Sequence, residues 1–247
     1  MEKKQIFLTG AAGSLGTCIR SRLRGRYGFR LLLHSTVPDD LHPDDQVVVG
    51  SVADHAAMVE AASGVDAVVH LAIRRWRGMN AEDVARATLE VDNPGVYNIL
   101  EAARIHEVPV VVFASTNHVT GLYEKDGLVS IPDGPVRPDG VYGAGKAFGE
   151  ALSRFYAERY GMRVICLRVA NFNGEDTPGR KYEPGYSRWL SPRDLAQLVW
   201  RSIETEHVGF GIFYGVSGGS EKKWDLSNAK ELLGYVPEDD GSLPEYG

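Results

Sequence analysis

The chain has 247 residues, of which 43% are hydrophobic and 24% are charged, a composition typical of a globular protein with a sizeable core. Its formal net charge of −6 argues against a nucleic-acid partner, because phosphate recognition favours a basic surface. No stretch reaches the roughly 18 apolar residues of a membrane span, and the first residues lack the apolar run of a signal peptide. We therefore expect a cytoplasmic protein without nucleic-acid or membrane partners.

The two cysteines, Cys18 and Cys166, are too few for a disulfide framework and do not have the spacing of metal ligands. Both lie among apolar residues, so we expect buried, inert thiols. No metal site is expected.

Short runs of apolar and β-branched residues alternate with longer helical stretches. We expect strands at 5–9, 29–34, 46–50, 66–72, 109–115, 163–169 and 211–215. We expect helices near 14–26, 54–63, 81–106 with a break or bend at Pro94, 142–160, from 191–192 onward, and 226–233. This alternation predicts an α/β fold, a Rossmann-like doubly wound parallel sheet with a small C-terminal substrate-binding portion.

No internal repeat or interdomain linker is evident, so residues 1–247 are expected to form a single domain. Two long segments rich in Gly, Pro and polar residues, 116–141 and 170–190, follow predicted strands and are expected to be loops. Because ligands of such sheets bind at the carboxyl ends of the strands, these two loops are the natural walls of a substrate pocket.

A glycine-rich turn lies between the first strand and the first helix. Its spacing is G-x-x-G-x-x-G, and glycines in this position let the backbone approach a pyrophosphate at the N-terminus of a helix. The alternative is an ordinary strand-to-helix turn. The residues predicted to contact the phosphates of NAD or NADP are Gly10, Ala12, Gly13, Ser14, Leu15 and Gly16.

The adenosine end of the predicted dinucleotide site departs from the usual pattern. A carboxylate at the end of the second strand normally binds the ribose and disfavours a 2′-phosphate, but this strand is followed by His34 and Ser35. The third strand is followed by Ser51 and Val52, where a second carboxylate was expected. These four residues are predicted to line the adenosine, and the choice between NAD and NADP stays open.

Tyr142 and Lys146 are spaced to lie on one face of a helix, one turn apart. A neighbouring ammonium favours the phenolate, so we expect a lowered tyrosine pKa and a proton-transfer role. On its own, such a pair is most often plain surface. The pair gains specificity from the hydroxyl of Thr116, which follows Ser115 at the end of a buried strand and can steady a developing alkoxide.

These motifs resemble the extended short-chain dehydrogenase/reductases. The segments VVFASTNHVTG at 111–121, RPDGVYGAGKAFGE at 137–150 and LRVANF at 167–172 resemble uronate dehydrogenases and the short-chain-type NAD-dependent glucose-6-phosphate dehydrogenases of archaea. The resemblance implies oxidation of the anomeric hydroxyl of an aldose, uronic acid or sugar phosphate to a lactone, and it slightly favours NAD.

The same resemblance assigns roles to individual residues. Tyr142 would be the general base, Lys146 its partner and Thr116 the hydroxyl that orients the reacting oxygen. The further cofactor contacts that it implies are Leu71, Ala72, Asn93 and Ser115. The sugar would be bound by Asn117, His118 and Asn171.

The group that would bind an anionic sugar is left open by the sequence. The arginine that binds the carboxylate in uronate enzymes falls at Pro184, with Arg180, Lys181 and Arg188 as nearby alternatives. Arg75 lies in a segment with three arginines that is equally consistent with an anion clamp or a solvated loop. Trp189 and Trp224 are expected in the core or in a pocket wall.

Two other functions use the same motifs. A nucleotide-sugar epimerase or dehydratase would need a sizeable C-terminal lobe, and only about 75 residues follow the strand at 163–169. A non-catalytic dinucleotide sensor fits the altered adenosine end, but the Tyr142, Lys146 and Thr116 set speaks against it. By family analogy, a small homo-oligomer is a further expectation.

Overall fold

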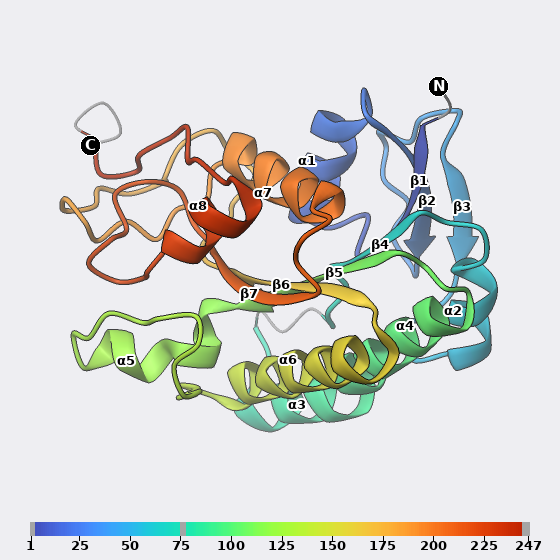
Figure 1. Ribbon diagram of the computed structural model, residues 1–247, viewed down its shortest axis with the longest axis horizontal. Helices are drawn as coiled ribbons and strands as arrows, with labels where there is room; N and C mark the ends of the chain where they lie inside the picture. The colour runs from blue at the N-terminus through green and yellow to red at the C-terminus, as the bar shows by residue number, and fades with distance from the viewer. Residues whose placement is uncertain (1–2, 75–77, 244–247) are drawn as a thin grey trace.

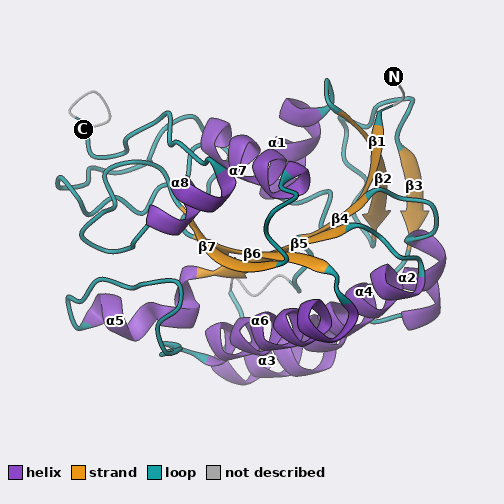
Figure 2. Ribbon diagram, in the orientation of Figure 1, coloured by secondary structure: helices purple, strands orange, loops and turns teal. Residues whose placement is uncertain are grey.

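The computed structural model describes residues 3–74 and 78–243. A parallel sheet lies between two layers of helices (Figures 1 and 2), which confirms the predicted fold class. The strand order is β3-β2-β1-β4-β5-β6-β7. The strands are β1 (Lys4–Thr9), β2 (Tyr27–Leu33), β3 (Gln46–Val49), β4 (Ala67–His70), β5 (Val110–Thr116), β6 (Arg163–Val169) and β7 (Phe210–Gly215).

The helices α1, α7 and α8 cover one face of the sheet, and α2, α3, α4 and α6 lie on the other (Figure 1). The helices are α1 (Ser14–Leu23), α2 (His55–Ala61), α3 (Ala81–Ala87), the π-helical η1 (Thr88–Asp92), α4 (Asn93–Ile105), the 3₁₀-helical η2 (Asn117–Thr120), α5 (Gly121–Lys125), α6 (Val141–Tyr160), α7 (Pro192–Glu204) and α8 (Ser227–Leu233). None of those in the described part of the chain has the length and apolarity needed to cross a membrane.

Successive side chains of each strand contribute to two apolar clusters, one on each face of the sheet. In β1, Ile6 and Leu8 belong to the apolar cluster that includes Ile19 of α1, whereas Phe7 belongs to the cluster that includes Met58 of α2. Successive side chains of a strand point to opposite faces, so a strand covered on both sides is apolar throughout. Each such buried side chain contributes about 1.5–3 kcal/mol.

The sheet changes direction at β1, because the chain runs outward to β2 and β3 and then returns to place β4 on the other side of β1. Thr9 and His70 are partners at the carboxyl ends of β1 and β4. The crevice at this reversal is the general ligand position of doubly wound sheets.

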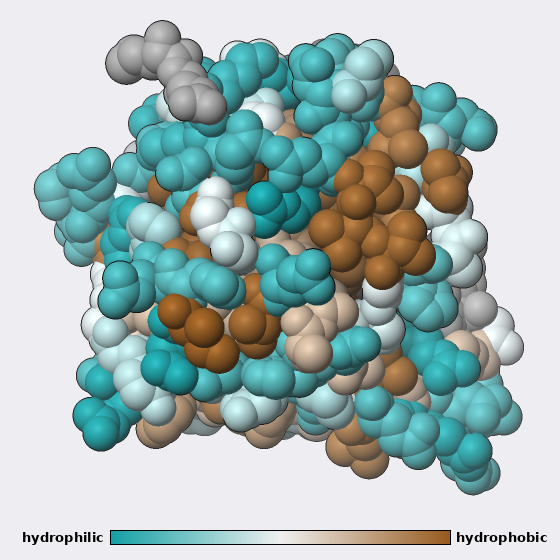
Figure 3. Space-filling view, turned by 90° about the vertical axis from the view of Figure 1, so that its right-hand side faces the viewer, coloured by the Kyte–Doolittle hydropathy of each residue, from teal (hydrophilic) through white to brown (hydrophobic). Residues whose placement is uncertain are grey.

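The outer strand β3 pairs only with β2 among the described strands, and its Val47 and Val49 are exposed. An apolar patch is visible on this side of the molecule (Figure 3). This edge is remote in the strand order from the carboxyl ends of β5 and β6.

The helix expected over 81–106 is divided by η1. Pro94 has no amide hydrogen to donate to the carbonyl of residue 90, and the Asn93 amide instead bonds five residues back to the Thr88 carbonyl. The break predicted at Pro94 is therefore a π-helical turn just before it.

Two details of the sequence-based prediction need correction. Residues 116–141 were expected to be loop, but they include η2 and α5, which follow each other directly. Cys18 is only half-buried, whereas Cys166 is buried as predicted. Burial raises the pKa of both thiols, that of Cys18 to about 11, so both are poor nucleophiles. Trp189 and Trp224 are buried in the core, as expected.

Candidate active site

Close backbone packing shapes the turn between β1 and α1. Gly10 has a φ of +69°, and a Cβ there would lie 2.8 Å from the Ala72 amide nitrogen. A Cβ on Gly16 would lie 2.5 Å from the Gly10 carbonyl oxygen, so glycine lets α1 pack onto the turn. Gly13 is the exposed N-cap of α1 and makes no side-chain cap, which leaves the first amides of the helix available to a phosphate.

The other residues predicted at this turn lie beside these glycines. Ser14 is exposed at the start of α1, and Ala12 and Leu15 are half-buried. The turn therefore fits the pyrophosphate of a dinucleotide, although contact by the individual residues stays a prediction.

Hydrogen bonds connect the residues after β4 to Thr9, directly before the glycine turn. The amides of Leu71 and Ala72 both donate to Thr9 Oγ1, each at 3.2 Å, and this hydroxyl lies 2.7 Å from His70 Nδ1. Burial lowers the pKa of His70 to about 3, so its ring is neutral and can accept from the Thr9 hydroxyl. The predicted cofactor residues Leu71 and Ala72 thus face the turn through their backbone.

The four residues predicted to line the adenosine differ in exposure. His34 and Ser35 follow β2 and are exposed. The Ser51 hydroxyl accepts from the amide two residues later at 3.2 Å. Val52 is buried against Gly95, where an added Cβ would lie 2.8 Å from Val52 Cγ2, so its side chain belongs to the core.

A buried arginine links this end to the glycine turn. Arg20 of α1 is fully buried; its Nε donates to the Ala11 carbonyl at 3.1 Å and its Nη2 lies 2.7 Å from Asp40 Oδ1. Sequence patterns gave no reason to single out this pair. It anchors the loop after β2 against the turn.

Tyr142, Lys146 and Thr116 come together at the carboxyl end of β5. Lys146 Nζ lies 6.0 Å from the centre of the Tyr142 ring and donates to the Ala114 carbonyl at 2.7 Å. A side-chain hydrogen bond joins Thr116 to Tyr142. The three side chains predicted to be catalytic are therefore neighbours.

The pKa of Tyr142 differs from the sequence-based expectation. Burial raises it to about 12 and Asp92 adds to the increase, while the Thr116 hydrogen bond acts in the opposite direction. Burial also lowers the pKa of Lys146 to about 8, although Asp92 and Glu150 act to raise it. Dehydration thus outweighs the attraction between ammonium and phenolate, which the sequence pattern alone had emphasised.

Asp92 is a site residue that the sequence analysis missed in favour of its neighbour Asn93. Its carboxylate is 7% exposed and accepts from the Arg74 amide at 2.7 Å. Burial raises its pKa, while that amide and Lys146 act to lower it. Asn93 instead approaches α6, where a Cβ on Gly145 would lie 3.1 Å from Asn93 Oδ1. The available signal was an acid directly before the Asn–Pro pair.

A buried ion pair connects α6 to β6, one helical turn beyond Lys146. Glu150 binds Arg168 through two hydrogen bonds of 2.9 and 2.8 Å. The Ser115 hydroxyl, predicted to contact the cofactor, donates to Glu150 Oε1 at 2.5 Å. This bond ties β5 to α6 one turn after Lys146, so the structure gives the Ser115 side chain a positioning contact.

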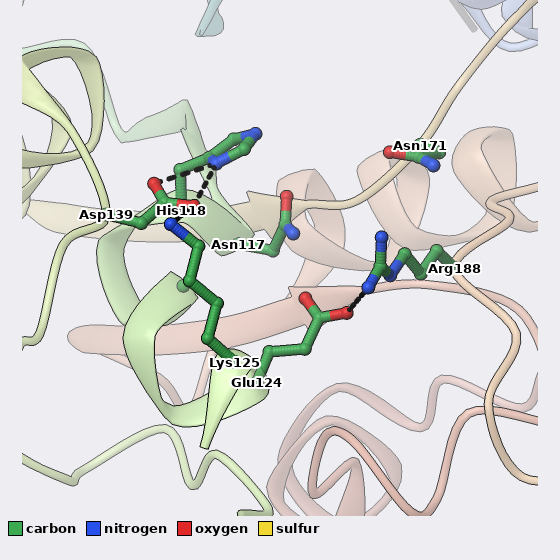
Figure 4. A pocket seen from close by; sticks show the side chains of 8 residues that line it. Asn117, His118, Glu124, Lys125, Asp139, Asn171 and Arg188 are labelled. Atoms are coloured by element: carbon green, nitrogen blue, oxygen red, sulfur yellow. Dashed lines mark hydrogen bonds and ion pairs between the residues drawn. The ribbon is translucent and has the colours of Figure 1, made fainter. Parts of the chain in front are cut away.

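A cavity of about 150 Å³ lies beside Asn117 and His118, the two residues that follow Thr116 (Figure 4). The predicted sugar-binding residues Asn117, His118 and Asn171 all line it. The remaining lining residues are Gly121, Glu124, Lys125, Asp139 and Arg188. Both long loops contribute to its walls. Arg75, predicted as a substrate contact, lies outside the described residues.

His118 lies between this cavity and Tyr142. Its ring centre is 6.1 Å from that of Tyr142, in an edge-on arrangement. His118 Nδ1 donates to Asp139 Oδ1 at 3.0 Å, which fixes the orientation of the ring. The Tyr142 ring therefore lies beside the wall of the cavity that His118 forms.

The chain as a whole is similar to sugar dehydrogenases. The uronate dehydrogenase of Pseudomonas putida is 37% identical over 237 residues, which cover 95% of this chain and 84% of that protein. The NAD-dependent glucose-6-phosphate dehydrogenase of Haloferax volcanii is 31% identical over 252 residues, covering 96% and 94%.

The structural comparison agrees. A mutant uronate dehydrogenase from Agrobacterium tumefaciens, complexed with NAD, matches with a TM-score of 0.82 and 31% identity, covering 97% of this chain and 86% of that one. A family model described as the NAD dependent epimerase/dehydratase family matches residues 6–192. The resemblance to extended short-chain dehydrogenase/reductases is thus confirmed, and the chain belongs to the NAD dependent epimerase/dehydratase family.

Proposed function

We propose that this protein oxidises the anomeric hydroxyl of a sugar to a lactone and reduces NAD or NADP. The observation that carries the proposal is the convergence of Tyr142, Thr116 and Lys146 between the glycine turn and the polar cavity. The names of the relatives support it, because they include dehydrogenases of uronates, of glucose 6-phosphate and of L-arabinose.

The chain supplies a base and an orienting hydroxyl for this reaction. Tyr142 Oη accepts the proton of the C1 hydroxyl while the hydrogen on C1 leaves as a hydride, and the C1–O bond becomes the lactone carbonyl. The Thr116 hydroxyl, already bonded to Tyr142, holds the same oxygen. Lys146 lies one turn behind the phenol and stabilises its anionic form.

The residues of the sheet edge fit a dinucleotide. The glycine turn would hold the pyrophosphate, and the Leu71 and Ala72 backbone and Lys146 would border the nicotinamide ribose. When bound, NAD or NADP supplies the hydride acceptor and a positively charged ring that favours the tyrosinate. Because the pKa of Tyr142 is raised to about 12, we expect turnover to increase with pH through the neutral and mildly alkaline range.

Replacement of the base tests the proposal. In Tyr142→Phe, we expect sugar-dependent reduction of NAD or NADP to fall at least about 100-fold, since a positioned general base contributes that much. Dinucleotide binding, followed by fluorescence titration, should change little. The matched control is Tyr160→Phe at the exposed end of the same helix, which should keep full turnover.

The outcomes separate the competing functions. Cofactor reduction that persists in Tyr142→Phe would overturn the assigned base. Tight dinucleotide binding without oxidation of any aldose, uronate or sugar phosphate would favour a sensor. Conversion of a nucleotide sugar without net cofactor reduction would favour an epimerase or dehydratase.

A further inference from the structure

The cavity contains an ion-pair cluster that the proton transfer does not use. Arg188 pairs with Glu124 Oε1, and Lys223 Nζ lies 2.9 Å from the same oxygen. The side chains of Glu124 and Lys223 are 10% and 11% exposed, whereas that of Arg188 is 38% exposed and lines the cavity. Arg188 is therefore the cation of this cluster that a ligand can reach.

Backbone hydrogen bonds hold Arg188 in place. The Asn171 amide donates to the Arg188 carbonyl at 2.8 Å, and the Leu190 amide donates to the Asn171 carbonyl at 2.9 Å. The Ser187 amide donates to the Gly219 carbonyl at 2.6 Å. The segment is thus attached on both sides, and the guanidinium is presented to the cavity in advance of any ligand.

Arg188 also has hydrogen-bonding capacity to spare. Its side chain is 38% exposed, and the one ion pair found for it among the described residues is made by Nη2 with Glu124, so the terminal nitrogens that face the cavity can still donate to a ligand, whereas the buried Nε cannot. Figure 4 shows its guanidinium against the Glu124 carboxylate, with the amides of Asn117 and Asn171 on neighbouring walls. A planar fork of donors in this setting matches a carboxylate or another anionic oxygen group.

The charges around the cavity leave a surplus of one positive charge. Arg188 and Lys223 are two cations against the single carboxylate of Glu124. Lys125 and Asp139 oppose each other at 3.9 Å and cancel. With the His118 imidazole left aside, a ligand with a single negative charge would neutralise the described part of this site.

One wall of the cavity lies beside Tyr142, and Arg188 belongs to a different wall. The Asn117 and His118 wall directly follows Thr116 and adjoins Tyr142, while Arg188 comes from the other loop. A sugar with C1 at Tyr142 would place a remote substituent towards Arg188.

We infer that Arg188 binds the anionic end of the sugar and that Glu124 makes the cavity selective for a monoanion, the carboxylate of a sugar acid. This inference rests on the proposed function. A phosphate dianion would bring a second negative charge beside the Glu124 carboxylate, and such like-charge repulsion is a common device for excluding the wrong ligand. Of the three cations that the sequence offered in this loop, Arg180, Lys181 and Arg188, only Arg188 lines the cavity.

Three sugars that share the same ring configuration but differ in charge test the inference. We would measure kcat/KM for glucose, glucuronate and glucose 6-phosphate, and for their galacto-configured counterparts. In Arg188→Met, the preference for the uronate over the neutral sugar should fall about 10- to 100-fold, mainly through KM, since a hydrogen bond to a charged group is worth about that much. In Glu124→Gln, use of the sugar phosphate relative to the uronate should rise about tenfold or more.

The controls separate recognition from folding. Arg188→Lys keeps the charge but lacks the planar fork of donors, so it should retain part of the preference. Arg180→Met removes a loop arginine outside the cavity and should retain all of it. An unchanged preference in Arg188→Met would overturn the inference, as would an unchanged phosphate-to-uronate ratio in Glu124→Gln.

A binding measurement makes the two proposals independent. Glucuronate is titrated by calorimetry into Tyr142→Phe and into Tyr142→Phe combined with Arg188→Met. Loss of binding only in the double variant supports the anion site even if no sugar is oxidised. Equal binding in both variants contradicts it even if the oxidation is confirmed.

Discussion

At the glycine turn the important contacts are between backbone atoms, whereas across Tyr142 the cavity is walled by charged side chains. Gly10, Gly16 and Ala72 approach so closely that a single added Cβ would overlap the main chain. In the cavity, Glu124, Arg188 and Lys223 come from three separate segments and meet through their charges.

The difference shows how one fold can keep a cofactor and change a substrate. The glycine turn is formed by backbone atoms and so depends on the fold itself. A side chain added there is expected to disturb both folding and dinucleotide binding. A charge-built site can be altered by one substitution with little effect on the fold. The following predictions test this contrast.

Among the variants that test this contrast, Gly16→Ala should have the largest effect, because it changes both stability and binding. The new Cβ would lie 2.5 Å from the Gly10 carbonyl oxygen, so α1 must move away from the turn. We expect a loss of about 1–3 kcal/mol in the free energy of unfolding and a dinucleotide affinity at least about tenfold weaker. Fluorescence titration and urea unfolding measure the two effects.

The control is Gly25→Ala, just beyond the same helix, where an added Cβ meets nothing within 4 Å. That variant should bind and unfold like the original protein. Normal dinucleotide affinity in Gly16→Ala would break the contrast, because the turn would then tolerate a side chain.

An intermediate effect is expected for Lys146→Met, at the boundary of the two regions. Burial lowers the pKa of this lysine from 10.5 to about 8. At about 1.4 kcal/mol per pKa unit, holding the charged lysine in the fold costs on the order of 3 kcal/mol at neutral pH. Removing it leaves the Ala114 carbonyl without its donor, at a cost of about 1 kcal/mol, so the cofactor-free variant should gain about 2 kcal/mol while losing turnover.

The pH dependence has a definite sign. The folded lysine binds fewer protons than the unfolded one, so the penalty is complete below about pH 8 and is relieved as the pH rises towards 10.5. The stability gain of Lys146→Met in urea unfolding should therefore shrink between pH 7 and about pH 9.5. A constant difference across that range would mean that the ammonium is not desolvated.

The smallest effect is expected for His34→Asp. This residue follows β2 at the adenosine end, where a side chain is predicted to determine the preference between NAD and NADP. A carboxylate after β2 repels a 2′-phosphate and bonds the ribose hydroxyls. We expect kcat/KM with NADP relative to NAD to fall about tenfold, whereas His42→Asp, with the same charge change in the same loop, should have little effect. An unchanged ratio in His34→Asp would place the ribose elsewhere.

Local patterns in the sequence predicted the sheet, the glycine turn and the Tyr142, Lys146 and Thr116 set. Each depends on a short-range feature, such as alternating apolar residues, a glycine between strand and helix, or a spacing of one helical turn. The residues that these patterns selected are neighbours in the fold because the carboxyl ends of parallel strands share one edge.

The same short-range view led to the wrong expectation for the tyrosine pKa and missed Asp92. A sequence shows which charge is near in the chain, but burial depends on the packing of α6 against η1 and β5. Dehydration, which no spacing reveals, outweighed the neighbouring ammonium.

What the amino-acid sequence determined by itself is the fold class and the pairing of Tyr142 with Lys146 on one face of a helix, because both follow from residues close together in the chain. Only the tertiary structure decided which charged side chains line the cavity. Glu124 meets a lysine 99 residues further along the chain, and Arg188 reaches it from the second loop. Ion pairs of this kind depend on distances through space, which the order of residues does not contain.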